Sequence, residues 1–209
     1  SDPVVERAGR SRARIRHRSK RAHPESVAGA LTWRRLLPGP LDGLTVVDLS
    51  EYICGPYATK LLADFGADVI KVERPGGDPA RRVGPFPGNQ PDPEKSGTFF
   101  YFNTNKRSIE LDLASTADRE ALLQLIDRAD AVVESFPPGY LDGLGIGWDV
   151  IHGRRPDIPL ISITNFGQES PYRDYVGNEL TLYALAGELY TMGVQEREPV
   201  TMYGTASLV

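Results

Sequence analysis

Short apolar runs alternate with segments of helical periodicity along this chain from residue 41 onward. Residues 44–49 (LTVVDL) are a β-branched apolar run that is typical of a buried parallel strand. The next segment, 57–65, has apolar residues at helical spacing, namely Ala58, Leu61, Leu62 and Phe65. Residues 68–73 (DVIKVE) then form a second strand-like run. This order predicts a βαβ unit with a right-handed crossover.

The alternation continues through the rest of the chain. We expect further strands at 108–113 (SIELDL), 131–134 (AVVE) and 160–164 (LISIT), and further helices at 116–126, 148–153 and 178–192. Thr116 is the expected N-cap of its helix, whose buried stripe comprises Leu122, Leu123, Leu125 and Ile126. The pattern predicts an α/β fold with a Rossmann-like, mostly parallel, doubly wound sheet and a ligand site at the carboxyl ends of the strands.

Two connections carry information about function. Residues 75–98 hold so many prolines and glycines that we expect a long loop without regular structure, and long loops in compact domains are usually functional. The first strand leads into residues 52–56 (YICGP), with neither a G-x-G-x-x-G motif nor a P-loop. The expected fold therefore gives no indication of NAD or ATP binding.

Composition bounds the remaining possibilities. The 209 residues are 40% hydrophobic and 25% charged, without the run of roughly 18 apolar residues that spans a bilayer. The amino-terminal residues are polar and rich in arginine, unlike a secretory signal, so we expect a cytoplasmic protein without membrane partners. With Cys54 as its only cysteine and three histidines, the chain predicts neither a disulfide framework nor a metal site.

Charge divides the chain into two parts. Residues 1–40 hold ten Lys/Arg against three Asp/Glu, a net charge of +7, whereas the rest holds 14 against 25, a net charge of −11. We expect 1–40 to be a flexible basic extension or linker, in which 31–37 with Trp33 forms a short helix or docking arm. No aromatic residue interleaves the arginines, so the segment does not predict nucleic-acid binding.

A set of longer motifs then resembles one enzyme family, the family III CoA-transferases, which include formyl-CoA and carnitine CoA-transferases and the related α-methylacyl-CoA racemases. The motifs occur in the order LDGLTVVDLS (41–50), GPYATKLLADFGADVIKVERPGGD (55–78), FNTNKRSIELDL (102–113), ADAVVESFPPG (129–139), LGIGWDVI (144–151) and ITNFGQESPY (163–172). Several long motifs in matching order are far more specific than one short pattern. The resemblance implies that residues 41–209 are part of the large domain of a CoA-transferase, which uses a CoA thioester as substrate and no tightly bound cofactor.

The resemblance also implies where CoA binds. It places Ile53 and Cys54 in the CoA channel, Arg74 beside the nucleotide, the segment Leu111, Asp112, Leu113 and Ala114 at the adenine, and Ser135, Phe136 and Pro137 in a second contact segment. A guanidinium can stack on adenine and pair with phosphate, although Arg74 could equally pair with a surface carboxylate. Plain strand packing is the alternative for 111–114. Gly143 stands where some relatives carry an arginine, so phosphate contacts would fall to Lys106 or Arg107, which could also be structural.

Asn178 and Glu179 bear on the type of reaction. In transferase relatives a glutamate at the position of Glu179 supports catalysis, whereas racemase relatives carry His and Asp at these two positions. An acidic residue in the first turn of a helix is the structural alternative. His152 lies out of register with the racemase histidine, and we expect it on the surface.

The expected nucleophile is an aspartate that the family carries after a Pro-to-Gly segment, here 199–209. The resemblance places it at position 209, which is Val, or just beyond. Family members are longer, with a second domain and an interlocked homodimer, so we expect a fragment that lacks the nucleophile. Three functions stay open: a CoA-transferase acting on an acyl-CoA and a carboxylic acid through an aspartyl acyl-enzyme, a racemase-like isomerase, and a silent CoA-binding remnant.

Overall fold

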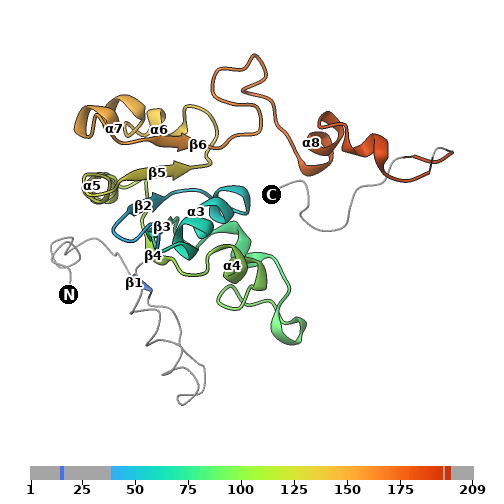
Figure 1. The fold of residues 1–209 in the computed structure, drawn as a ribbon, viewed down its shortest axis with the longest axis horizontal. Helices are drawn as coiled ribbons and strands as arrows, with labels where there is room; N and C mark the ends of the chain where they lie inside the picture. The colour runs from blue at the N-terminus through green and yellow to red at the C-terminus, as the bar shows by residue number, and fades with distance from the viewer. Residues whose placement is uncertain (1–14, 17–38, 195, 199–209) are drawn as a thin grey trace.

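The structure is a computed structural model that describes residues 15–16, 39–194 and 196–198. Five parallel strands form its centre (Figure 1). They are β2 (Thr45–Asp48), β3 (Asp68–Glu73), β4 (Arg107–Glu110), β5 (Ala131–Glu134) and β6 (Leu160–Ser162). A two-residue strand, β1 (Ile15–Arg16), pairs antiparallel with β4 at one edge.

The strand order is β1-β4-β3-β2-β5-β6, which confirms the doubly wound parallel sheet. From β2 the chain adds β3 and β4 on one side, and then returns to add β5 and β6 on the other. Val46 of β2 accordingly pairs with Val69 on one side and with Ala131 on the other. The winding reverses between β2 and β5, and ligands of open α/β sheets bind at such a switch point.

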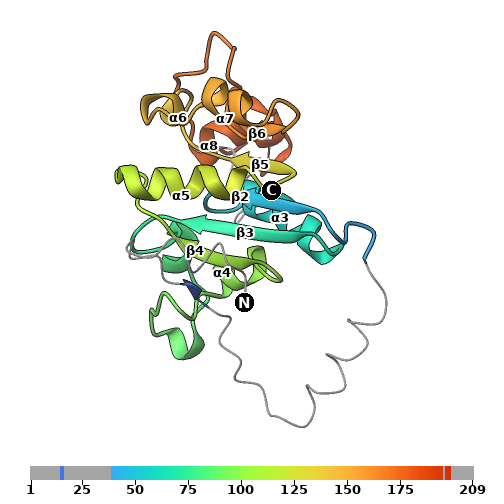
Figure 2. The same ribbon diagram turned by 90° about the vertical axis from the view of Figure 1, so that its left-hand side faces the viewer.

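Helices cover both faces of the sheet. One core cluster joins Val46 and Val133 to Ala63 of α3 (Cys54–Asp64). The other joins Val47 and Val132 to residues of α5 (Thr116–Ile126) and α7 (Trp148–Arg154). Neighbouring strand residues point to opposite faces, which explains this division. In Figure 1, α5 lies to the left of the strands and α3 to their right, and Figure 2 shows α5 in front.

The fully buried residues of helix α3 are not its large apolar ones, although Leu62 packs against the core while half-buried. It begins at Cys54, earlier than the expected Tyr57, and its buried residues are Gly55, Pro56, Thr59 and Ala63. Leu61 and Phe65 of the expected apolar stripe are 40% and 56% exposed. A Cβ on Gly55 would lie 2.2 Å from the Ser50 Cβ, so the close approach of helix and strand end requires glycine here.

The Pro/Gly-rich connection is more ordered than the sequence predicts. Within 75–98 lie two 3₁₀ turns, η1 (Pro79–Arg82) and η2 (Pro87–Asn89), and an unpredicted helix, α4 (Gly97–Phe102), begins there. The side chains of Asp78 and Ser96 cap η1 and α4 by accepting from backbone N–H groups. Proline is compatible with the first turn of a helix, so its frequency did not exclude short helical turns.

Several element boundaries also differ from the sequence-based expectation. Ser115 and not Thr116 is the N-cap of α5, because the Ser115 hydroxyl accepts from the Asp118 N–H at 3.4 Å. Strands β4 and β6 end three and two residues earlier than expected, and a short helix, α6 (Tyr140–Gly143), was not predicted. The buried stripe of α5 is confirmed for Leu122, Leu123 and Ile126, whereas Leu125 is half-buried.

The expected helix at 178–192 is divided into two elements. α8 (Glu179–Leu185) is followed by a 3₁₀ turn, η3 (Glu188–Thr191), with Gly187 between them at φ +81°. A glycine in the left-handed conformation ends helices because it alone adopts that geometry without cost. Figure 1 shows α8 and η3 apart from the sheet, at the end of a long connection from β6.

Most of the basic segment 1–40 lies outside the described residues, as does the expected arm at 31–37. Of this segment, Ile15 and Arg16 pair with Ile109 and Ser108 of β4, and the flexible extension stays a prediction. In the described part of the chain, no helix has the length and apolar character needed to cross a membrane.

Candidate functional site

The carboxyl ends of β2, β3 and β5 bring together Arg74 and Ser135, which the sequence analysis assigned to CoA, and Glu51, which it did not assign. Arg74 directly follows β3, Glu51 follows β2, and Ser135 directly follows β5. The backbone N–H of Glu51 donates to the Ser135 hydroxyl oxygen at 2.8 Å. The Ser135 hydroxyl oxygen is therefore an acceptor within the protein.

Arg74 and Glu51 form a two-point ion pair beside this contact. The guanidinium donates from Nε to Glu51 Oε1 at 2.6 Å and from Nη2 to Glu51 Oε2. This hydrogen bonding raises the pKa of Arg74 above its usual value. The Arg74 side chain is 56% exposed. The guanidinium can pair with Glu51 through its edge and still offer its planar face to a ligand. Arg74 can therefore serve as a CoA contact or only as half of a surface ion pair.

The two residues of the expected channel differ in exposure. Ile53 is 1% exposed as a whole residue and belongs to the interior, so its role in the channel stays a prediction. Cys54 is the first residue of α3, and it is exposed. Tyr52 precedes them at φ +70°, in the left-handed region, so the chain turns sharply where β2 passes into α3.

A buried network of charges beneath this turn was not predicted. The Lys71 ammonium, on β3, donates to the Ser50 carbonyl oxygen at 2.6 Å and lies 2.8 Å from Asp78 Oδ2. Asp78 in turn accepts from the N–H groups of Tyr52 at 3.2 Å and Ala80 at 2.7 Å. Lys71 therefore connects the β2–α3 turn to the start of the Pro/Gly-rich connection.

Asp48 and Lys106 extend this network across the sheet. Burial favours a higher pKa for Asp48, but the charges of Lys71 and Lys106 outweigh it and lower the pKa. Lys106 Nζ lies 2.9 Å from Asp48 Oδ2 and donates to the Pro56 carbonyl oxygen at 2.8 Å. Burial lowers the pKa of Lys106 to about 8, despite the attraction of Asp48.

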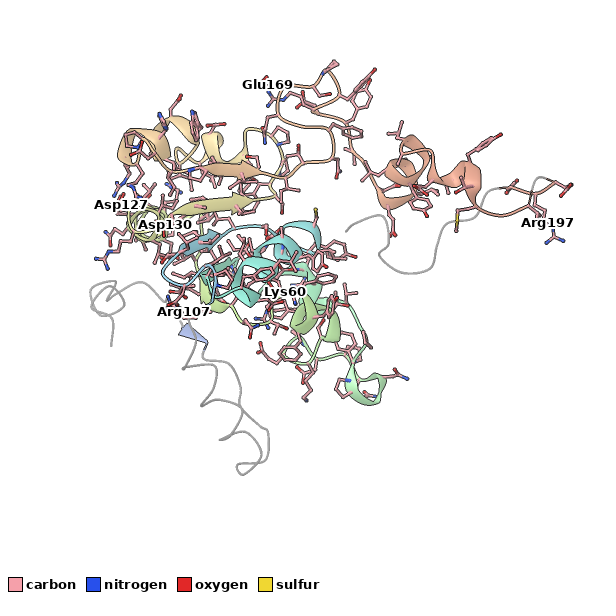
Figure 3. The ribbon with its side chains drawn as sticks, viewed as in Figure 1. Lys60, Arg107, Asp127, Asp130, Glu169 and Arg197 are labelled. Carbon is pink, nitrogen blue, oxygen red and sulfur yellow. The ribbon has the colours of Figure 1, made fainter. Side chains whose placement is uncertain are left out.

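These contacts bear on the phosphate contacts that we expected from Lys106 or Arg107. The Lys106 side chain is 2% exposed and enclosed by protein oxygens, so its role here is structural. Arg107 forms a two-point ion pair with Asp68 on the neighbouring strand. Figure 3 labels Arg107 beside the strands, far from the α8 end of the chain.

A second buried ion pair fixes the start of the same connection. Arg81 donates to Glu73 through Nε at 2.6 Å and through Nη2 at 2.8 Å. Burial opposes ionisation of Glu73, but the hydrogen bonds from Arg81 and Ser108 lower its pKa to about 2. The guanidinium also stacks on Phe99 of α4, with Cζ 3.7 Å from the ring centroid. A charged pair of this kind in the interior holds its loop strongly, because breaking it leaves a buried charge.

The segment Leu111–Ala114 turns sharply after β4. Leu111 is 1% exposed, whereas Asp112 and Ala114 are exposed. Arg119 donates to the carbonyl oxygens of Leu113 and Ala114 at 2.8 and 2.9 Å, and the Ala114 N–H donates to Asp112. Most backbone groups that we expected at the adenine therefore have partners within the protein, and adenine recognition here stays a prediction.

A cavity of about 390 Å³ opens beside the second contact segment. Its lining includes Ser135, Phe136 and Pro137 from the end of β5, together with residues 163–165 after β6 and 173–177. The Phe136 N–H donates to Glu134 Oε2 at 2.6 Å, and burial raises the pKa of Glu134. This contact fixes the backbone of the cavity wall.

Asn178 and Glu179 stand at the start of α8. The Asn178 side chain accepts from the Thr181 N–H at 3.0 Å, and the Thr181 hydroxyl accepts from the Asn178 N–H at 2.9 Å. Glu179 is the acid of the first turn and is half-buried. Its place fits the structural alternative, and its catalytic role stays a prediction. The expected position of the nucleophile, in 199–209, lies outside the described residues.

His152 is the remaining residue that the sequence analysis placed. His152 is exposed and stacks on Trp148, with ring centroids 4.6 Å apart, which confirms its place on the surface. Across the described residues, no group of His, Cys, Asp and Glu side chains is arranged to hold a metal ion.

Residues 41–207 match the sequence profile described as CoA-transferase family III. The chain belongs to this family. The family assignment expected from the motifs is therefore confirmed.

Curated relatives in the family are CoA-transferases. Succinyl-CoA:(R)-benzylsuccinate CoA-transferase subunit BbsE of Thauera aromatica is 43% identical over 74% of this chain and 38% of its own length. Succinyl-CoA:mesaconate CoA-transferase of Haloarcula hispanica is 41% identical over 77% of this chain and 42% of its own length. The chain thus spans about two fifths of the length of these relatives.

Solved structures of the family have the same fold. A CAIB/BAIF family protein from Brucella suis superposes with a TM-score of 0.76 at 34% identity, covering 83% of this chain and 46% of that one. Rv3272 from Mycobacterium tuberculosis, in its orthorhombic crystal form, gives a TM-score of 0.71 at 35% identity, covering 80% and 46%.

Proposed function

We propose that the protein carrying this chain transfers CoA from an acyl-CoA to a carboxylic acid. The observation that carries the proposal is the meeting of Arg74, Glu51 and Ser135 at the switch point of a family III chain. Ligands of doubly wound sheets bind at this edge. The curated relatives are named for succinyl-CoA and for dicarboxylic acids such as mesaconate, which supports carboxylic acids as donor and acceptor.

The proposed chemistry needs a carboxylate nucleophile. Its oxygen attacks the thioester carbonyl, the carbon–sulfur bond breaks and CoA leaves as the thiolate, which gives a mixed anhydride. The thiolate then attacks the enzyme carbonyl of this anhydride, releasing the donor acid and forming an enzyme-bound CoA thioester. The acceptor carboxylate repeats the two steps in reverse. Covalent catalysis of this kind divides one difficult exchange into easier steps.

We assign the CoA-facing roles to Cys54, Arg74, the 111–114 segment and Ser135–Pro137, with Glu179 in support of the nucleophile. Arg74 is the most specific member, because its guanidinium can pair with phosphate and stack on a base while Glu51 holds it in place. The aspartyl nucleophile and the completeness of the polypeptide remain part of the proposal. So do the cytoplasmic location and the assembly into a homodimer.

One experiment separates this function from the alternatives. The protein is incubated with succinyl-CoA and a series of carboxylic acids, and new thioesters are followed by chromatography, with hydroxylamine added to trap any acyl-enzyme. We expect a new CoA thioester and a trapped hydroxamate. Exchange of the α-proton of a 2-methylacyl-CoA in D₂O without CoA transfer would support an isomerase. Binding of CoA with neither reaction would support a silent CoA-binding protein.

Assembly is tested separately by light scattering of the eluting protein. Relatives are named as subunits, including the beta subunit of the succinyl-CoA–L-malate CoA-transferase of Chloroflexus aurantiacus. We expect a mass of two chains for the intact protein. A monomer would contradict the proposed homodimer, and so would a complex with a different subunit.

A further inference from the structure

The cavity beside Ser135–Pro137 has the size of a site for a small ligand. Its volume of about 390 Å³ lies toward the lower end of the range for ligand pockets. A compact organic acid fits this volume, whereas a complete CoA molecule is larger than the cavity. The cavity wall includes the predicted CoA segment, so a molecule bound here would lie beside the path proposed for CoA.

One polar atom of the lining is buried without a partner. The hydroxyl oxygen of Thr164 makes no hydrogen bond to any described residue, although solvent does not reach it. Thr164 lines the cavity. Buried polar atoms in native proteins are nearly always paired with a protein group, an ordered water or a ligand, so this hydroxyl is a candidate donor to a molecule that enters the cavity.

A cation lines the same cavity. Arg173 is 43% exposed, and its Nη2 atom lies 3.9 Å from the place that a Cβ would take on Gly139. Its ion-pair partner among the described residues is the adjacent Asp174, whose side chain is 83% exposed, with Nε and Oδ1 3.4 Å apart. An exposed pair of this length is weak. Most of the donors of the Arg173 guanidinium are therefore available to an anion.

The chemistry of these donors selects the kind of anion. Arginine binds carboxylates through two parallel hydrogen bonds, and a threonine hydroxyl can donate a further one. Asn165 also lines the cavity, and its amide makes a long bond of 3.4 Å to the Gly177 carbonyl oxygen. The lining thus offers a charged donor group and two neutral donors around a small volume.

We infer that this cavity binds one carboxylate of a dicarboxylic acid through Arg173, with Thr164 and Asn165 as neighbouring donors. The second carboxylate of the acid is the one that exchanges CoA, and in this respect the inference rests on the proposed function. Arg173 is then the residue that selects a dicarboxylate over a monocarboxylate of the same length.

The test measures binding, so that it does not depend on turnover. Equilibrium dialysis at fixed ionic strength compares radiolabelled succinate with butyrate, in which a methyl group replaces one carboxylate. We expect succinate to bind more tightly than butyrate. Arg173→Gln should weaken succinate at least about 10-fold and change butyrate less than about twofold, since a charge-assisted hydrogen bond is worth about a factor of ten or more. Arg173→Lys should keep part of the preference for succinate over butyrate, because the positive charge is retained.

Two further variants make the result specific. Arg154→Gln removes an arginine that pairs with Asp127, and it should leave both affinities unchanged. The two residues end the helices that lead into β5 and β6, whereas the cavity follows the carboxyl ends of these strands, and Figure 3 labels Asp127. Thr164→Val, which keeps the shape of the side chain, should weaken succinate several-fold. If Arg173→Gln lowered the affinities for succinate and butyrate by the same factor, the inference would be overturned.

A third ligand distinguishes the two anions that Arg173 could bind, a carboxylate of the acid and a phosphate of CoA. Adenosine 3′,5′-bisphosphate carries the nucleotide phosphates of CoA, and its affinity should not change in Arg173→Gln. A loss there would place a CoA phosphate at Arg173 and overturn the inference. CoA transfer without selection at Arg173 would reject this inference alone, and selective succinate binding without CoA transfer would reject only the proposed function.

Discussion

The backbone N–H of Glu51 donates a hydrogen bond of 2.8 Å to the hydroxyl oxygen of Ser135, and this contact joins the ends of the two strands between which the sheet changes its winding. The same Glu51 holds Arg74 through its carboxylate. A single residue therefore links the ends of β2, β3 and β5, the three strands that carry the proposed CoA site.

Ser135→Ala should loosen this link. The substitution leaves the Glu51 N–H without its acceptor, and we expect the free energy of unfolding to fall by about 1 kcal/mol, or a few degrees in Tm. Ser135→Asn retains an acceptor and should cost less. Thermal unfolding of the two variants checks this order, and an equal loss in both would show that side-chain volume and not the hydrogen bond matters.

Arg74→Gln should weaken binding of acyl-CoA while leaving stability nearly unchanged. We expect KM for the thioester to rise about 10-fold, because the proposed charged partner of the CoA phosphates is lost. Less than about 1 kcal/mol of stability should be lost, because the pair is exposed. Glu51→Gln is the matched control, since it removes the pair but keeps the guanidinium. An unchanged KM in Arg74→Gln would favour the alternative of a purely structural ion pair.

Lys71→Met should be strongly destabilising. It removes the cation between Asp48 and Asp78, and losing one partner of a buried ion pair costs about 3–5 kcal/mol. We expect the double variant Lys71→Met, Asp78→Leu to cost clearly less than the sum of the two single changes. Denaturant unfolding of all four proteins gives the coupling, and additive losses would mean that the two groups do not interact.

Acid should destabilise the protein through Glu73. The pKa of this carboxyl is about 2 in the folded protein and 4.5 in its ordinary state, so its ionised form stabilises the fold above pH 4.5. This contribution, of about 3 kcal/mol, is lost as the pH falls from about 4.5 through about 2. Glu73→Gln should be less stable at pH 7 and should lose less stability between pH 5 and 2. Parallel pH profiles of the two proteins would contradict the assignment.

The sequence predicted the sheet well because burial on both faces leaves a clear apolar pattern. The runs around Val47, Val69 and Val132 each became a central parallel strand. Gly187 was less informative. The apolar pattern continues on both sides of Gly187, so it predicted one helix over 178–192. The backbone turns left-handed at this glycine, which separates α8 from η3.

The candidate site was predicted in part, because local motifs identify single residues but not the contacts between distant segments. Local motifs identified Arg74 and Ser135, but not Glu51 as the residue between them, since that contact depends on strand order. The charges of Lys71 and Glu73 were visible within the strand DVIKVE, where they alternate with the apolar residues Ile70 and Val72. A lysine and a glutamate at consecutive inward or buried positions are rare unless paired, and this signal could have indicated the network.

Asp78 has a consequence for protein engineering. Its carboxylate accepts hydrogen bonds from Tyr52 and Ala80 and pairs with Lys71, so the β2–α3 turn and the connection after β3 share one anchor. Exchanging the connection alone for that of another family member would transplant a loop without its counterpart. Chimeras that exchange the β2–α3 turn and the connection after β3 together, and that keep Lys71, should fold. These two segments are therefore the smallest unit that can be redesigned at this end of the sheet.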